Sequence, residues 1–145
     1  MHETLDHQTF ICFEVGELEP TTKMLRVSNG GCPFPFHFRA ETGTVEELEV
    51  IAYPLGVRPN TEYDVLETQL QSGDCVIFCS DGIIEAENES GEQFGFDRTS
   101  EMIRKACDDD FSAEASLNRI FDVVNTFKGN APQSDDMTCV VLQVK

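Results

Sequence analysis

The sequence is poor in basic residues. Ten lysines and arginines stand against 27 aspartates and glutamates, which gives a formal net charge of −17. Binding to nucleic-acid phosphates requires a basic surface, and an anionic membrane surface would repel so acidic a chain. A negative field is compatible with concentrating cations or with meeting a basic partner. We therefore expect neither nucleic acid nor membrane among the partners.

Long hydrophobic runs are also missing. No apolar stretch approaches the roughly 20 residues that a membrane helix needs. Met1 is followed by His2, Glu3 and Asp6 rather than by the basic and then apolar stretch of a signal peptide. The six cysteines include no C-x-x-C pair and no histidine at zinc spacing beside them, so we expect reduced, buried thiols. These absences predict a cytoplasmic protein in a reducing compartment.

Two common catalytic motifs are absent as well. The chain has no G-x-S-x-G nucleophile elbow and no G-x-x-x-x-G-K-[ST] phosphate loop. It shows no internal repeat, low-complexity segment or linker. A chain of 145 residues is long enough to bury a real core, and we expect residues 1–145 to form a single domain.

The most informative stretch is a short apolar run that ends on Ser80-Asp81-Gly82. Residues 75–79 follow a Gly-Asp turn and are typical of a buried central strand. A second strand, predicted over 139–144, is preceded by Asp135 and Asp136. If the two strands are antiparallel neighbours, Asp81 and Asp135 meet at the same end of the sheet, and oxygen ligands of this kind favour Mg²⁺ or Mn²⁺.

Asp81 has a simpler interpretation, because Asp-Gly is a common turn dipeptide. The Asp135-Asp136 pair favours the metal, since adjacent like charges at a strand start are costly without a cation. Glu85 and Glu87 are expected to face solvent. The run 108–110 resembles a metal cluster, but a loop and helix cap is the better interpretation because it joins two predicted helices.

The remaining strands are predicted from the alternation of apolar and polar residues and from the turn residues between them. Residues 10–18 and 24–27 predict a hairpin, 28–31 a turn, and 62–70 a half-buried strand. Residues 34–39 alternate strictly, and their neighbouring prolines predict a strand that lies at an edge or starts late. His37 is expected to be a solvated edge residue rather than a phosphate or metal contact.

Two amphipathic helices follow the central strand. Asp97 is the expected cap of the first and Ser112 of the second, which should end at Gly129. Their apolar stripes repeat at helical spacing and are expected to be core. Strands followed by helices that pack on them predict an α+β fold, an antiparallel sheet layered with helices.

Several segments together resemble a known family. Residues 80–86 and 135–138 are similar to the last two motifs of the metal-dependent protein serine/threonine phosphatases. The closer similarity is to the bacterial branch typified by the phosphatase domain of stage II sporulation protein E. Other segments agree in order: 27–31, 53–57, 73–74 and 91–95. The family's early Asp-bearing strand and Asp-Gly-x-Gly-His-Gly-like segment have no counterpart, so the chain resembles the C-terminal majority of that domain.

The resemblance implies an antiparallel β-sandwich flanked by helices, here without its N-terminal strands. It also implies that Asp81 and Asp135 bind one Mg²⁺ or Mn²⁺ and act in catalysis through that metal and its water, with Asp136 ordering its neighbour. The implied substrate is phosphoserine or phosphothreonine on a bacterial regulatory protein of the anti-sigma-factor antagonist type.

Two alternatives stay open. The chain could be a phosphatase-like binding or regulatory module without catalytic competence, or an inactive fragment. The family's N-terminal strands have no counterpart in this sequence. We therefore also expect an exposed sheet edge and a homodimer that forms through it.

Overall fold

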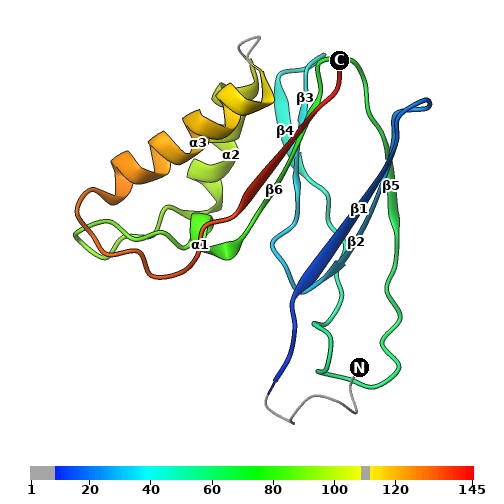
Figure 1. Ribbon diagram of the computed structural model, residues 1–145, viewed down its shortest axis with the longest axis horizontal. Coiled ribbons are helices and arrows are strands. Elements are labelled where there is room, and N and C mark those ends of the chain that lie inside the picture. Colours follow the sequence, from blue (N-terminus) through cyan, green and yellow to red (C-terminus); the bar gives the residue numbers. More distant parts are fainter. Residues whose placement is uncertain (1–8, 109–111) are drawn as a thin grey trace. The chain divides into compact units, whose positions relative to one another are not determined.

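The computed structural model describes residues 9–108 and 112–145, which form an α+β fold of antiparallel sheets and helices, as the sequence predicts (Figure 1). The chain divides into two compact units. One contains the described residues up to Phe34 together with Leu48–Leu70, and the other contains Pro35–Glu47 and Gln71–Lys145. None of the described helices is long and apolar enough to span a bilayer.

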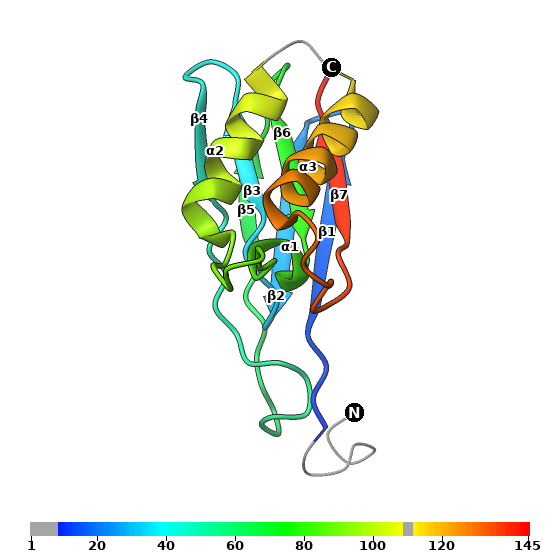
Figure 2. The ribbon, with the colours of Figure 1, turned by 90° about the vertical axis from the view of Figure 1, so that its left-hand side faces the viewer.

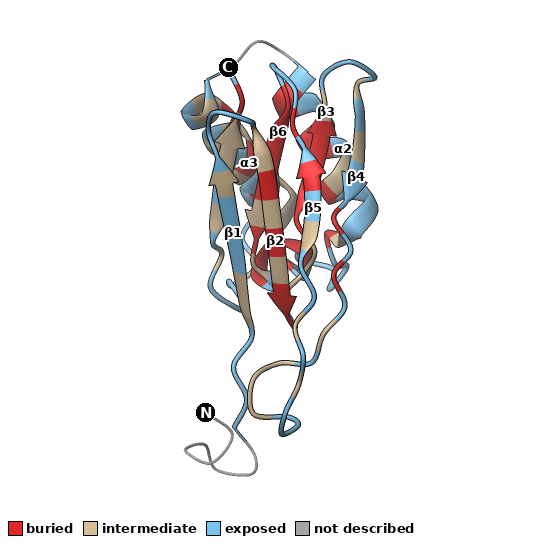
Figure 3. Ribbon diagram, turned by 90° about the vertical axis from the view of Figure 1, so that its right-hand side faces the viewer, coloured by how far each residue is buried: buried red, intermediate tan, exposed pale blue. Residues whose placement is uncertain are grey.

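The first unit is built on the predicted hairpin. Strand β1 (Phe13–Glu19) pairs antiparallel with β2 (Met24–Gly30), and β5 (Leu66–Gln69) pairs with the other side of β2. Leu25 and Val27 are buried, whereas much of β1 is exposed (Figure 3). The alternation of β2 therefore fixes which face of this sheet is covered.

The predicted turn at 28–31 is wrong, because β2 continues through Gly30. The chain reverses at Gly31, whose φ of +89° suits glycine. The Asn29 side chain accepts a hydrogen bond from the Cys32 N–H at 2.8 Å and donates one to the Cys32 carbonyl at 2.9 Å. The turn chemistry of Asn29 thus acts from within the strand and stabilises the bend that follows it.

The second unit contains a four-stranded antiparallel sheet in the order β4-β3-β6-β7. Its strands are β3 (Phe36–Arg39), β4 (Thr44–Glu47), β6 (Cys75–Cys79) and β7 (Cys139–Gln143). Strand β6 is central and buried, as predicted. Strand β3 is also central, since it pairs with both β4 and β6, so an edge position is wrong. It starts late, after Pro33 and Pro35, and their missing N–H groups therefore remove no ladder hydrogen bond.

His37 is another correction. It is 0% exposed rather than solvated, and its Nε2 lies 3.0 Å from Oδ2 of Asp74, which is itself buried. Because β3 is flanked by strands on both sides, a side chain at its middle cannot reach an edge. The ring is held instead by a buried carboxylate.

Three helices lie in the described part of this unit: α1 (Asp81–Ile84), α2 (Gly95–Asp108) and α3 (Ala113–Lys128). Helices α2 and α3 lie side by side over the sheet (Figure 2). The predicted stripes provide much of the core, including Met102, Ile103, Ile120 and Val124.

The helix ends follow the prediction in part. The Ser112 side chain accepts a hydrogen bond from the Ala115 N–H at 3.2 Å, and the Gly129 N–H donates to the Asn125 carbonyl. Asp97 is not the cap of α2, because the helix already begins at Gly95. Its carboxylate lies in the first turn, where it still interacts favourably with the helix dipole.

Candidate metal centre

Strands β6 and β7 bring the two aspartate motifs to one end of their sheet. The strands pair antiparallel from Cys75–Gln143 to Cys79–Cys139, and the Ser80 N–H donates to the Thr138 carbonyl at 2.9 Å. The antiparallel pairing therefore continues by one residue pair, Ser80 with Thr138, beyond the ends of the two strands. Asp81 follows Ser80 at the end of β6 and begins α1, and Asp135 belongs to the segment that enters β7.

The Ser80 hydroxyl ties the two segments together. It accepts a hydrogen bond from the Thr138 N–H and donates one to the Asp136 carbonyl, both at 2.9 Å. Gly82 packs against the same segment, since a Cβ atom added there would lie 2.4 Å from the Asp136 carbonyl oxygen. Glycine is needed here because two backbones approach closely.

The three candidate carboxylates are exposed and partly oriented by local hydrogen bonds. Asp81 accepts from the Gly82 N–H at 3.0 Å through Oδ1, and Asp135 accepts from the Asp136 N–H at 2.7 Å through Oδ1. The Gln133 side chain donates to the Asp135 carbonyl at 2.8 Å. Each of the first two carboxylates thus has one oxygen held by its neighbour's backbone, which restricts its rotation.

The donor chemistry fits a hard divalent cation. Mg²⁺ is commonly held by one or two carboxylates together with waters and phosphate oxygens. The described residues form no group of three or more His, Cys, Asp or Glu side chains that could hold a metal ion. Asp81 and Asp135 are two carboxylates and do not by themselves make such a group.

The other acidic candidates follow the prediction in part, because Asp108 lies within α2 rather than in the predicted loop. Glu85 and Glu87 are exposed. Asp108 is the last residue of α2, and the rest of the predicted 108–110 cap lies outside the described residues.

Burial and hydrogen bonding make two of the cysteines poor nucleophiles. All six are free. Hydrogen bonding to Cys75 and burial raise the pKa of Cys107 far above its ordinary value, and burial raises the pKa of Cys139 to about 11. These two thiols therefore stay neutral at pH 7. Cys12 is exposed, so the expectation of buried thiols is wrong at that position.

Sequence reasoning missed the role of Ser80. It identified the strand and the aspartate but not the hydroxyl between them. The available signal was its position, because a small hydroxyl residue directly after a buried strand can satisfy backbone groups of the neighbouring chain.

Comparison with known proteins supports the resemblance. Residues 1–145 match the family model described as Stage II sporulation protein E (SpoIIE). The chain is 22% identical over 145 residues to phosphoserine phosphatase RsbU of Bacillus subtilis (strain 168), with 100% of this chain and 42% of that protein covered.

Two solved structures show the same fold. The SiaA-PP2C domain of Pseudomonas aeruginosa has a TM-score of 0.77 at 17% identity, with 91% of this chain and 51% of that chain covered. The Mn-presoaked phosphatase domain of SpoIIE from Bacillus subtilis has a TM-score of 0.67 at 19% identity, with 92% and 56% covered. The chain thus spans about half the length of the relatives it matches.

Proposed function

The chain belongs to the stage II sporulation protein E family, a family of PP2C-type phosphatases, and from this premise we propose that it contributes Asp81 and Asp135 to the metal site of a protein phosphatase. The substrate we propose is phosphoserine or phosphothreonine on a regulatory protein of the anti-sigma-factor antagonist type. The metal is Mg²⁺ or Mn²⁺. Residues 1–145 make up one phosphatase-like domain that resembles the C-terminal majority of the family's domain.

The observation that carries this proposal is the Ser80 clamp, by which we mean the two hydrogen bonds that Ser80 Oγ makes to the Asp136 carbonyl and the Thr138 N–H. The clamp and the close approach of Gly82 hold the backbones of the two aspartate segments against each other. The two segments that carry these aspartates are thereby kept together without a covalent link.

The roles of the residues follow from this arrangement. Asp81 and Asp135 hold the ion, and Asp136 orients Asp135 through its backbone N–H. A bound divalent ion would neutralise phosphate charge and lower the pKa of a coordinated water. The Ser80 clamp holds the two backbone segments together, so less ordering of the chain is needed when the ion binds.

The proposal is tested by Mn²⁺ binding, measured by calorimetry on the 145-residue chain. Asp81→Asn and Asp135→Asn should each weaken binding about 10- to 100-fold, since each removes one charged ligand. Asp122→Asn is the matched control, because it removes an exposed carboxylate on α3. Unchanged affinity in both site variants would contradict the metal assignment.

A second measurement separates two functions. Mn²⁺-dependent hydrolysis of para-nitrophenyl phosphate that is lost in Asp81→Asn supports the enzyme, whereas hydrolysis that survives this change contradicts it. Metal binding without hydrolysis supports a phosphatase-like binding module.

A further inference from the structure

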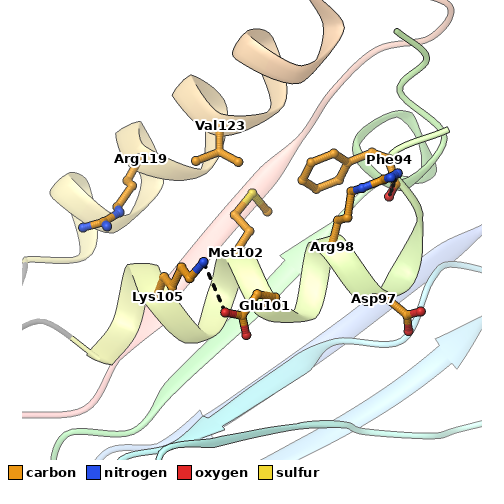
Figure 4. A pocket seen from close by; sticks show the side chains of 8 residues that line it. All are labelled: Phe94, Asp97, Arg98, Glu101, Met102, Lys105, Arg119 and Val123. Carbon is orange, nitrogen blue, oxygen red and sulfur yellow. Dashed lines mark hydrogen bonds and ion pairs between the residues drawn. The ribbon is translucent and has the colours of Figure 1, made fainter. Parts of the chain in front are cut away.

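A cleft lies between α2 and α3, away from the aspartate segments in sequence and built from other residues. It has a volume of about 400 Å³. Phe94, Met102 and Val123 provide its apolar surface (Figure 4). A volume in this range suits a small organic molecule.

Cationic side chains lie at both ends of the cleft. Lys105 from α2 and Arg119 from α3 lie at one end, and Arg98 lies beside Phe94 at the other (Figure 4). Arg98 is anchored by Glu92 and by the carbonyls of Gln93 and Phe94. Two cations from different helices lie together at the first end, which makes it the better place for a ligand's charged group.

Two carboxylates also line the cleft, Asp97 and Glu101. Lys105 Nζ lies 3.2 Å from Glu101, but Arg104 donates two hydrogen bonds to the same carboxylate, each at 2.9 Å. If Lys105 turned toward a ligand, Glu101 would keep its guanidinium partner. Lys105 can therefore change partner without leaving an unpaired charge.

The charge of these helices differs from that of the whole chain. Helices α2 and α3 carry five acidic and five basic residues and are neutral together. The chain as a whole has a net charge of −17, so the entire excess lies outside them. An anion is therefore repelled less by these two helices than by the rest of the chain taken together.

We propose that the cleft between α2 and α3 binds a small amphiphilic anion, with its apolar body against Phe94, Met102 and Val123 and its carboxylate, sulfonate or phosphate group at Lys105 and Arg119. The ligand is a free molecule rather than a lipid in a bilayer, because the apolar surface lies inside a cleft between helices. This proposal does not depend on phosphatase activity.

Two dyes with the same aromatic body test it. One is 1-anilinonaphthalene-8-sulfonate, and the other is the neutral N-phenyl-1-naphthylamine; binding is followed by fluorescence. Lys105→Gln/Arg119→Gln should weaken binding of the sulfonate about fivefold and leave the neutral dye unchanged, because only the head group loses a contact. Val123→Trp, which fills the cleft at a partly exposed position, should weaken both dyes by about tenfold or more.

The control is Arg58→Gln/Lys128→Gln, which removes two cations that do not line the cleft and should leave sulfonate binding unchanged. Equal weakening in this control would mean that net charge alone governs binding and would overturn the proposal. So would dye binding that Val123→Trp does not alter. Decanoate should displace the sulfonate dye, and displacement by phosphatidylglycerol vesicles but not by decanoate would also refute the assignment.

Discussion

At the scale of single residues, Asp74 is a buried carboxylate held by three hydrogen bonds. It accepts hydrogen bonds from the Ala40 N–H at 2.9 Å, the Gln71 N–H at 2.9 Å and His37 at 3.0 Å. Burial acts to raise its pKa, but these hydrogen bonds outweigh burial and hold the pKa of Asp74 below its ordinary value. Because an ionised carboxylate can only accept hydrogen bonds, the contact with Asp74 requires His37 to carry a proton on Nε2 and to donate it.

We expect Asp74→Asn to lower the free energy of unfolding by about 1–3 kcal/mol at neutral pH, since backbone donors lose a charged acceptor. A group whose pKa is depressed in the folded state contributes stability above its ordinary pKa and loses it as the pH falls through the folded value. The difference between the wild type and the variant should therefore be widest at pH 7 and shrink below about pH 4. Urea unfolding across this range measures it. A difference that does not change with pH, or an equal loss in Asp122→Asn, would contradict the account.

At the scale of elements, the junction between β6 and α1 decides whether the aspartate segments stay together. We expect Gly82→Ala to cost about 1–3 kcal/mol, because its Cβ would lie 2.4 Å from the Asp136 carbonyl oxygen and the backbones must separate. The same separation should weaken Mn²⁺ binding. Calorimetry and thermal unfolding check both effects.

Gly91→Ala is the matched control for this prediction. Its φ is +78°, but an added Cβ meets no atom within 4 Å. This change should therefore lower stability by about 1–2 kcal/mol through backbone strain alone and leave Mn²⁺ binding intact. If both variants affect Mn²⁺ equally, the contact between the segments is not what holds the site.

The sequence is sufficient to predict an element where a local signal determines its type or its ends. Ser112 and Gly129 delimit α3, and the alternation of apolar residues identifies β6. The prediction failed where the position of an element depends on the elements that pack beside it. Nothing local shows that β3 has a strand on each side, so His37 was expected in solvent although it is buried against Asp74. The pairing of β6 with β7 was a hypothesis that tertiary structure alone could test.

At the scale of the whole molecule, charge is the dominant feature. A net charge of −17 on 145 residues repels itself in the compact state. The described ion pairs are largely exposed, such as Arg26 with Glu67 and Arg104 with Glu101, and exposed pairs contribute little each. Salt should therefore affect stability mainly by screening repulsion.

We expect the unfolding midpoint of the chain to rise by roughly 3–6 °C when NaCl is increased from about 20 mM to about 500 mM, because the Debye length shortens below the spacing of most exposed charges. Glu41→Gln/Glu49→Gln/Glu62→Gln removes three exposed negative charges and should reduce this rise. Arg58→Gln/Lys128→Gln makes the chain more negative and should increase it. Thermal unfolding of the wild type and the two variants at both salt concentrations measures the rise of the midpoint in each and so ranks them. An equal rise in all three would mean that salt acts through hydration rather than through the repulsion of this acidic chain.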